Sequence, residues 1–64
     1  MMRIRDLRTC AGMTQRELGD KLGISGAAVA QWETGGKRPT VDNLERMADI
    51  FGVSVDYILG RDTA

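Results

Sequence analysis

The side chains that could do covalent or metal chemistry in this 64-residue sequence are few, and they are not spaced as a catalytic set. There is no histidine, and Cys10 is the only cysteine, so neither a disulfide nor a zinc site is available. The nine carboxylates fall on helix caps and polar faces, while Lys21 and Tyr57 lack neighbours that would tune them. The sequence therefore predicts no enzyme, no metal and no cofactor. We interpret Cys10 as a small core residue.

The remaining polar chemistry is that of amides and cations, which suits contacts with a polyanion. The net charge is zero, but residues 1–38 hold seven Lys and Arg against four Asp and Glu, and residues 39–64 hold two against five. The basic half could face phosphate groups while the acidic half faces away. A solvated surface explains the same asymmetry, so charge alone leaves the partner open.

Short helices must position these side chains. Apolar spacing and cap residues predict helical segments, caps included, over residues 3–11, 14–23, 25–33, 40–52 and 54–60. Thr14 and Glu17 have the spacing of a capping box. The residues expected to face the core are Ile4, Leu7, Ala11, Leu18, Leu22, Val29, Trp32, Val41, Leu44, Met47, Ala48 and Phe51. We expect one all-α domain over residues 1–64, with little room for a ligand-sized pocket.

Residues 15–34, QRELGDKLGISGAAVAQWET, carry the most specific pattern. Two helices meet here at a short turn that contains Gly23, a residue that readily adopts the left-handed conformation of a sharp turn. Gly19 lies where the second helix must approach the third, so a side chain larger than alanine would push the pair apart. The pattern predicts a helix-turn-helix made by the second and third helices.

Five stretches carry a family resemblance: T-Q-R-E-L at 14–18, L-G-I-S at 22–25, V-A-Q-W-E at 29–33, K-R-P at 37–39 and G-V-S-V-D-Y-I-L at 52–59. On these motifs the sequence resembles the Cro/CI-type (XRE) helix-turn-helix family of phage and bacterial repressors. The resemblance implies a compact, five-helix, lambda-repressor-like domain whose third helix enters the major groove. It also implies a homodimer on double-stranded DNA, at palindromic operators with half-sites about 34 Å apart.

Helical phase selects the residues that would meet the bases. The face opposite Val29 and Trp32 agrees with the DNA-contacting positions of the family, and its predicted base contacts are Gly26, Ala27, Ala30 and Gln31. Gln31 is the only long polar side chain among them, and its amide suits the N6/N7 edge of adenine. The alanine methyls could touch thymine methyls. The alternative is that Gln31 is merely solvated and the small residues contact nothing specific.

The predicted phosphate contacts are Arg8, Gln15, Arg16, Ser25, Thr34, Lys37 and Arg38. Gln15 and Arg16 open a helix whose N-terminus favours anions, and Gln15 matches a phosphate-contacting glutamine of the family. Lys37 and Arg38 lie on a glycine-rich loop that could follow the backbone of DNA. The resemblance further implies an ion pair between Arg8 and Glu33, which would orient Arg8 toward phosphate.

The last predicted helix contributes a possible dimer interface. Val55, Tyr57 and Ile58 cannot all be buried by a single turn, and this region helps form the dimer interface in the family. Core packing is the competing interpretation of the same three residues.

The leading functional hypothesis is a cytoplasmic, sequence-specific transcriptional regulator that acts as a repressor, without a small-molecule ligand and without a membrane span. The alternative is an antitoxin-like or adaptor module whose main partner is another protein. A palindromic site selected from random DNA would favour the first hypothesis, and a requirement for a protein partner would favour the second.

Overall fold

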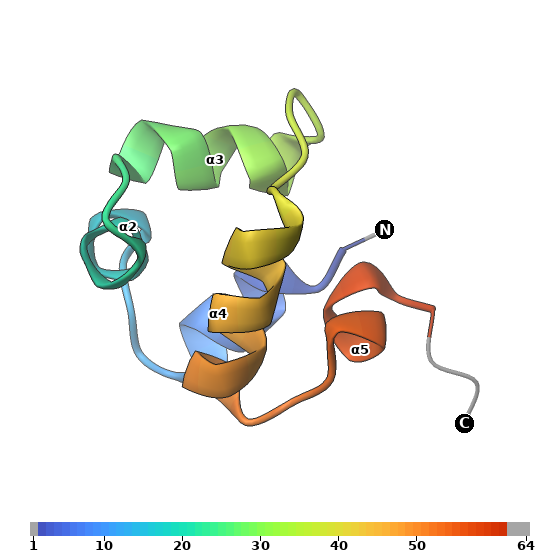
Figure 1. The fold of residues 1–64 in the computed structure, drawn as a ribbon. Helices are drawn as coiled ribbons and strands as arrows, with labels where there is room; N and C mark the ends of the chain where they lie inside the picture. The colour runs from blue at the N-terminus through green and yellow to red at the C-terminus, as the bar shows by residue number, and fades with distance from the viewer. Residues whose placement is uncertain (1, 62–64) are drawn as a thin grey trace.

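The computed structural model describes residues 2–61, and within this range the chain forms five α-helices and no strand. The helices are α1 (Ile4–Cys10), α2 (Gln15–Leu22), α3 (Gly26–Thr34), α4 (Val41–Phe51) and α5 (Val55–Leu59). Figure 1 shows α3 across one end of the molecule, α2 crossing it steeply, and α4 leading away from it toward α5. The predicted all-α fold is confirmed. Residue 1 and residues 62–64, which belong to the predicted domain, lie outside the described residues.

Local signals at the helix ends explain where the helices start and stop. The Thr14 hydroxyl accepts from the Glu17 backbone N–H at 3.0 Å, and the Glu17 carboxylate accepts from the Thr14 N–H at 2.9 Å, so the predicted capping box is confirmed. Hydroxyl oxygens cap three more helices in the same way, at Ser25, Thr40 and Ser54. Helices of 5 to 11 residues are too short to be stable alone, so they depend on these caps and on packing.

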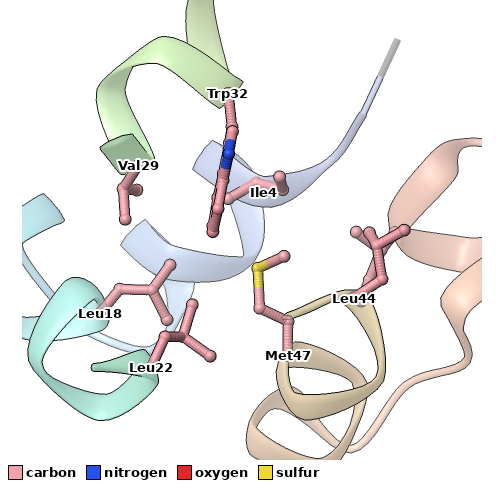
Figure 2. Close-up of a cluster of buried hydrophobic side chains, with 8 residues drawn as sticks. Ile4, Leu18, Leu22, Val29, Trp32, Leu44 and Met47 are labelled. Atoms are coloured by element: carbon pink, nitrogen blue, oxygen red, sulfur yellow. The ribbon is translucent and has the colours of Figure 1, made fainter. Parts of the chain in front are cut away.

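Eight buried apolar side chains, contributed by all five helices, form the core: Ile4, Leu18, Leu22, Val29, Trp32, Leu44, Met47 and Ile58. Figure 2 shows the Trp32 ring projecting from α3 into the space between α2 and α4. The predicted inward face of α3 is confirmed by the burial of Val29 and Trp32. One side of α3 therefore packs in the core, and the opposite side faces outward.

Three predicted core residues lie at the surface instead. Cys10 is exposed because it is six positions from the buried Ile4, about 240° around the helix. Ala11 caps the end of α1 and is exposed as well. Val41 is 70% exposed, since it opens α4 one turn before the stripe of that helix reaches the core. These corrections leave the helix assignments unchanged.

Candidate nucleic-acid interface

The outward side of α3 is the surface that the sequence predicts will meet DNA bases. Opposite the buried Val29 and Trp32, the structure exposes Ala27 and Gln31, with Ala30 partly buried beside them. Figure 1 shows that no other described helix lies over this side of α3. Small apolar groups and one amide are therefore presented together on an accessible helix face.

Gly26 has a different place from the one predicted. A Cβ atom added at Gly26 would lie 3.1 Å from both the backbone N and the Cα of Arg16. The side-chain direction of residue 26 therefore points at the start of α2 and not outward. A small residue is needed here because the backbone at the start of α2 lies against it. The predicted base contact of Gly26 stays a prediction.

Gly19 makes the second close approach between backbones. A Cβ atom there would lie 2.8 Å from the carbonyl oxygen of Ile24 and 3.0 Å from the carbonyl carbon of Ser25. The Ile24 N–H also donates to the Gly19 carbonyl oxygen at 2.9 Å. The predicted need for a small residue is confirmed, but the contact is with the turn between the helices, and even alanine is too large. Gly19 and Gly26 together fix how α3 crosses α2.

A hydrogen-bonded network connects the first three helices beneath this surface. Arg8 donates from Nε to Glu33 Oε2 at 2.7 Å, from Nη2 to Glu33 Oε1 at 3.2 Å and from Nη1 to the Met13 carbonyl oxygen at 2.8 Å. The Gln15 amide nitrogen donates to Glu33 Oε1 at 3.1 Å. The predicted pair of Arg8 and Glu33 is confirmed, whereas the Gln15 contact was not foreseen. It depends on how three helices meet, which no spacing in the sequence reveals.

The network keeps Glu33 ionised. Burial alone would raise the pKa of the Glu33 carboxyl, but hydrogen bonds from Arg8 and Gln15, with the positive charges of Arg8 and Arg5, lower it below its usual value. The hydrogen bond to Glu33 likewise raises the pKa of Arg8. Glu33 is the only acidic residue of α3, and its side chain is only 5% exposed. The outward side of α3 therefore carries no carboxylate.

Arg8 does not face outward as the sequence analysis expected. Its side chain is 11% exposed, and Nε, Nη1 and Nη2 each donate to an acceptor within the chain. The direct phosphate contact predicted for Arg8 stays a prediction, although each of its nitrogens already donates within the chain. Its guanidinium holds Glu33, and Glu33 in turn holds the amide of Gln15 at the first residue of α2.

Exposed cations flank α3 at both ends. Arg16 lies against Gly26 at the start of the helix, and Lys37 and Arg38 follow directly after its end. Nine helical residues span about 13 Å, close to the major-groove width of about 12 Å. Positive charge therefore lies near both ends of α3.

The hydroxyls at the two ends of α3 have internal partners. Ser25 Oγ accepts from the Ala28 N–H at 3.1 Å, and Thr34 Oγ1 donates to the Gln31 carbonyl oxygen at 3.3 Å. Both residues are exposed, so each hydroxyl could also meet a phosphate. Their predicted phosphate contacts stay predictions.

The predicted dimer residues of α5 divide into two kinds. Tyr57 is 37% exposed and Val55 is partly buried, so both reach the surface. Ile58 is fully buried in the core. Its predicted dimer contact is therefore corrected, because the side chain anchors α5 to the rest of the domain.

An open cleft of about 470 Å³ lies beside the loop after α3, whereas the length of the chain predicted little room for a ligand-sized pocket. Its lining includes Trp32, Lys37, Arg38, Leu59 and Arg61. Glu33 also lines the cleft, and its carboxylate is already paired with Arg8.

Within residues 2–61, no group of three His, Cys, Asp or Glu side chains could hold a metal ion. None of the described helices is long and apolar enough to cross a membrane.

Comparisons with known proteins agree with this geometry. A helix-turn-helix family model matches residues 4–58. The chain is 35% identical over 60 residues to the HTH-type transcriptional regulator ImmR of Bacillus subtilis (strain 168), an alignment that covers 94% of this chain and 47% of ImmR. It is 34% identical over 59 residues to the cryptic phage CTXphi transcriptional repressor RstR of Vibrio cholerae, covering 92% of this chain and 53% of RstR. The chain thus spans about half the length of these curated relatives.

The fold also matches a solved protein–DNA complex. The P22 c2 repressor in complex with synthetic operator 9T superposes with a TM-score of 0.85 at 35% identity, covering 94% of this chain and 91% of the repressor chain. The similarity therefore extends over nearly the whole of both chains.

Proposed function

The chain belongs to the helix-turn-helix family, and from this premise we propose that it is a sequence-specific DNA-binding transcriptional regulator that represses at a palindromic operator. The observation that carries the proposal is the outward side of α3. It presents Ala27, Ala30 and Gln31 without a carboxylate, and cations flank it at both ends. The similarity to a repressor solved in complex with a synthetic operator supports DNA as the partner.

In the proposed complex α3 lies in the major groove, and the groups on its outward side read base edges. The Gln31 amide can accept and donate at once, which fits the N7 and N6–H groups of adenine. The methyl groups of Ala27 and Ala30 fit the methyl groups of thymine, and their small size lets the helix lie deep in the groove. Gln31 therefore supplies the polar part of base recognition.

Replacing Gln31 by alanine is expected to cost about 1–3 kcal/mol at one base pair in each half-site, because one bidentate contact is lost. Binding to sequences that already differ at that base pair should hardly change. The measurement is competition binding with a panel of operator variants. A uniform loss of affinity at every variant would contradict base readout by Gln31.

Phosphate contacts in this proposal come from residues around α3 and not from Arg8. Gln15 and Arg16 open α2, where backbone N–H groups favour an anion, and Glu33 fixes the Gln15 amide. Lys37 and Arg38 follow the end of α3 on the opposite edge of the groove. These contacts carry no sequence information and set the register of the protein on DNA.

Salt dependence provides a test of the loop contacts. A dimer that contacts about eight phosphates should give a slope of log K against log salt near −7. Replacing Lys37 by glutamine should make the slope shallower by about 0.9 for each half-site, with equal weakening across operator variants. Lys21→Gln is the matched control, since Lys21 is an exposed lysine of α2 outside the proposed contacts. An unchanged slope for Lys37→Gln would remove this residue from the phosphate contacts.

The proposed functional form is a homodimer on DNA, with Val55 and Tyr57 of α5 facing the second copy. Both side chains reach the surface, and the buried Ile58 fixes the helix that carries them. Two copies related by a two-fold axis would place two recognition helices about 34 Å apart.

Selection of binding sites from a random duplex pool, at two salt concentrations, tests the whole proposal. Enrichment of a palindrome with half-sites about one helical turn apart supports a dimeric, sequence-specific regulator. Weak binding that is sensitive to salt but indifferent to sequence would contradict it and favour a module whose main partner is a protein.

A further inference from the structure

Arg3 ties the start of α1 to the end of α5. Its backbone N–H donates to the Ile58 carbonyl oxygen at 2.7 Å, and its Nη1 donates to the Tyr57 carbonyl oxygen at 2.9 Å. The guanidinium carbon lies 4.2 Å from the centroid of the Tyr57 ring. Arg3 is also the N-cap residue of α1, and its carbonyl oxygen accepts from the Leu7 N–H at 3.0 Å. One residue therefore completes the ends of two helices.

α5 needs such support because it has only five residues. A helix this short is unstable alone, and its last carbonyl groups lack partners within the helix. The Arg61 N–H bonds to the Asp56 carbonyl oxygen at 2.9 Å, and the Gly60 N–H bonds to that of Tyr57 at 3.1 Å. The Ile58 carbonyl oxygen receives the N–H of Arg3. The positive charge of Arg3 also lies at the C-terminal, electronegative end of the helix.

Arg3 also contacts an exposed aromatic ring. Tyr57 is 37% exposed, and the partly buried Arg3 side chain stacks on its ring. The guanidinium also donates to the Tyr57 carbonyl oxygen, so Arg3 contacts both the ring and the backbone of Tyr57. Ile58 anchors the helix from the core side, but it does not determine the orientation of the Tyr57 ring.

We propose that Arg3 is a positioning residue for dimerisation: it holds α5 and the Tyr57 ring in the arrangement against which a second copy of this chain packs. The inference rests on the proposed function, in which α5 faces the second copy on DNA. Arg3 itself makes no contact with DNA in this arrangement. Its loss should weaken the pairing of two copies and leave the binding of a single copy to a half-site unchanged.

The test compares affinities for duplexes that carry one or two half-sites of the selected palindrome. Arg3→Ala is expected to reduce the preference for two half-sites over one about tenfold, from the combined loss of a cation–π contact and a hydrogen bond. Arg3→Lys keeps the charge near the ring and the backbone N–H, so its preference should lie between those of the wild type and Arg3→Ala. Arg46→Ala is the control, since Arg46 is an exposed arginine of α4 paired with Asp42, and it should keep the wild-type preference.

The outcomes separate the inference from the function on which it rests. A wild-type preference for two half-sites in Arg3→Ala overturns the positioning role while leaving the dimeric regulator intact. Equal losses on one and two half-sites also overturn it, because Arg3 would then support the fold as a whole. A wild-type protein that does not prefer two half-sites overturns the dimer itself and, with it, the positioning role.

Discussion

Replacing Glu33 by alanine is expected to lower the free energy of unfolding by about 3 kcal/mol, because it leaves the partly buried Arg8 guanidinium without its carboxylate. The same change releases the Gln15 amide at the start of α2. DNA affinity should therefore fall even at temperatures where the variant is folded. Urea denaturation followed by Trp32 fluorescence measures the first effect, since Trp32 is the only tryptophan.

Glu45→Ala is the matched control, since Glu45 is an exposed glutamate of α4. Its effect on stability should stay within about 0.5 kcal/mol. If Glu33→Ala and Glu45→Ala had the same midpoint of denaturation, the network would have no structural role.

The contribution of Glu33 should also depend on pH in a defined direction. The folded state lowers the pKa of Glu33, so the folded protein holds this carboxyl in its charged form more strongly than the unfolded chain does. The stabilisation is present above the ordinary glutamate pKa of about 4.3 and is lost as the pH falls through the lower folded value. The stability difference between wild type and Glu33→Ala should therefore shrink on acidification below about pH 4. A difference that grew with acidification would contradict the assigned direction.

The second large effect is expected for Gly19→Ala, which should lower the free energy of unfolding by about 2–3 kcal/mol. The added methyl would lie 2.8 Å from the Ile24 carbonyl oxygen and 3.0 Å from the Ser25 carbonyl carbon. Both are backbone atoms of the turn, and they cannot give way without moving α3 against α2. We therefore expect DNA affinity to fall together with stability, as measured by denaturation and operator binding.

The sign of this result is informative, because helix propensity acts in the opposite direction. In an open helical position, Gly→Ala would stabilise the protein by up to about 1 kcal/mol. Gly36→Ala is the steric control: Gly36 lies in the loop after α3, and a Cβ there would lie at the ordinary contact distance of 3.7 Å from the Gln31 carbonyl oxygen, so no loss of this size is expected. If Gly19→Ala stabilised the domain, the close approach between α2 and the turn would not be a constraint.

The helix boundaries could be predicted because their signals are local. Thr14 with Glu17, and a glycine such as Gly23 in the left-handed conformation, act within one turn of the chain. The faces of α2 and α3 followed from apolar spacing, and the family resemblance is confirmed by the match over residues 4–58. Each of these inferences needs only neighbours in sequence.

Inferences that depended on how helices meet were less successful. Gly26 was assigned to the bases because it lies on the face opposite Val29 and Trp32, but the side-chain direction of this residue points at the backbone of Arg16. The pair of Arg8 and Glu33 was expected to point Arg8 toward phosphate, but the third bond of Arg8, to the Met13 carbonyl oxygen, was not foreseen. Ile58 was assigned to the dimer interface, with core packing as the competing interpretation, and it is fully buried in the core. Periodicity gives the faces of a helix, and only the tertiary arrangement says which neighbour covers each face.

The bonds from Arg3 to Tyr57 and Ile58 have a consequence for biosynthesis. They join residues 54 and 55 positions apart in the sequence. The first turn of α1 therefore cannot form these bonds until residues 57 and 58 have been synthesised. The core is also incomplete until then, since Ile58 is one of its fully buried side chains. A nascent chain that has not yet exposed Ile58 outside the ribosome therefore lacks both the closing residue of its core and the end of α5. We expect the domain to fold in one step after that residue emerges, so a chain terminated before it would be left to proteolysis and would not occupy an operator as a partial protein.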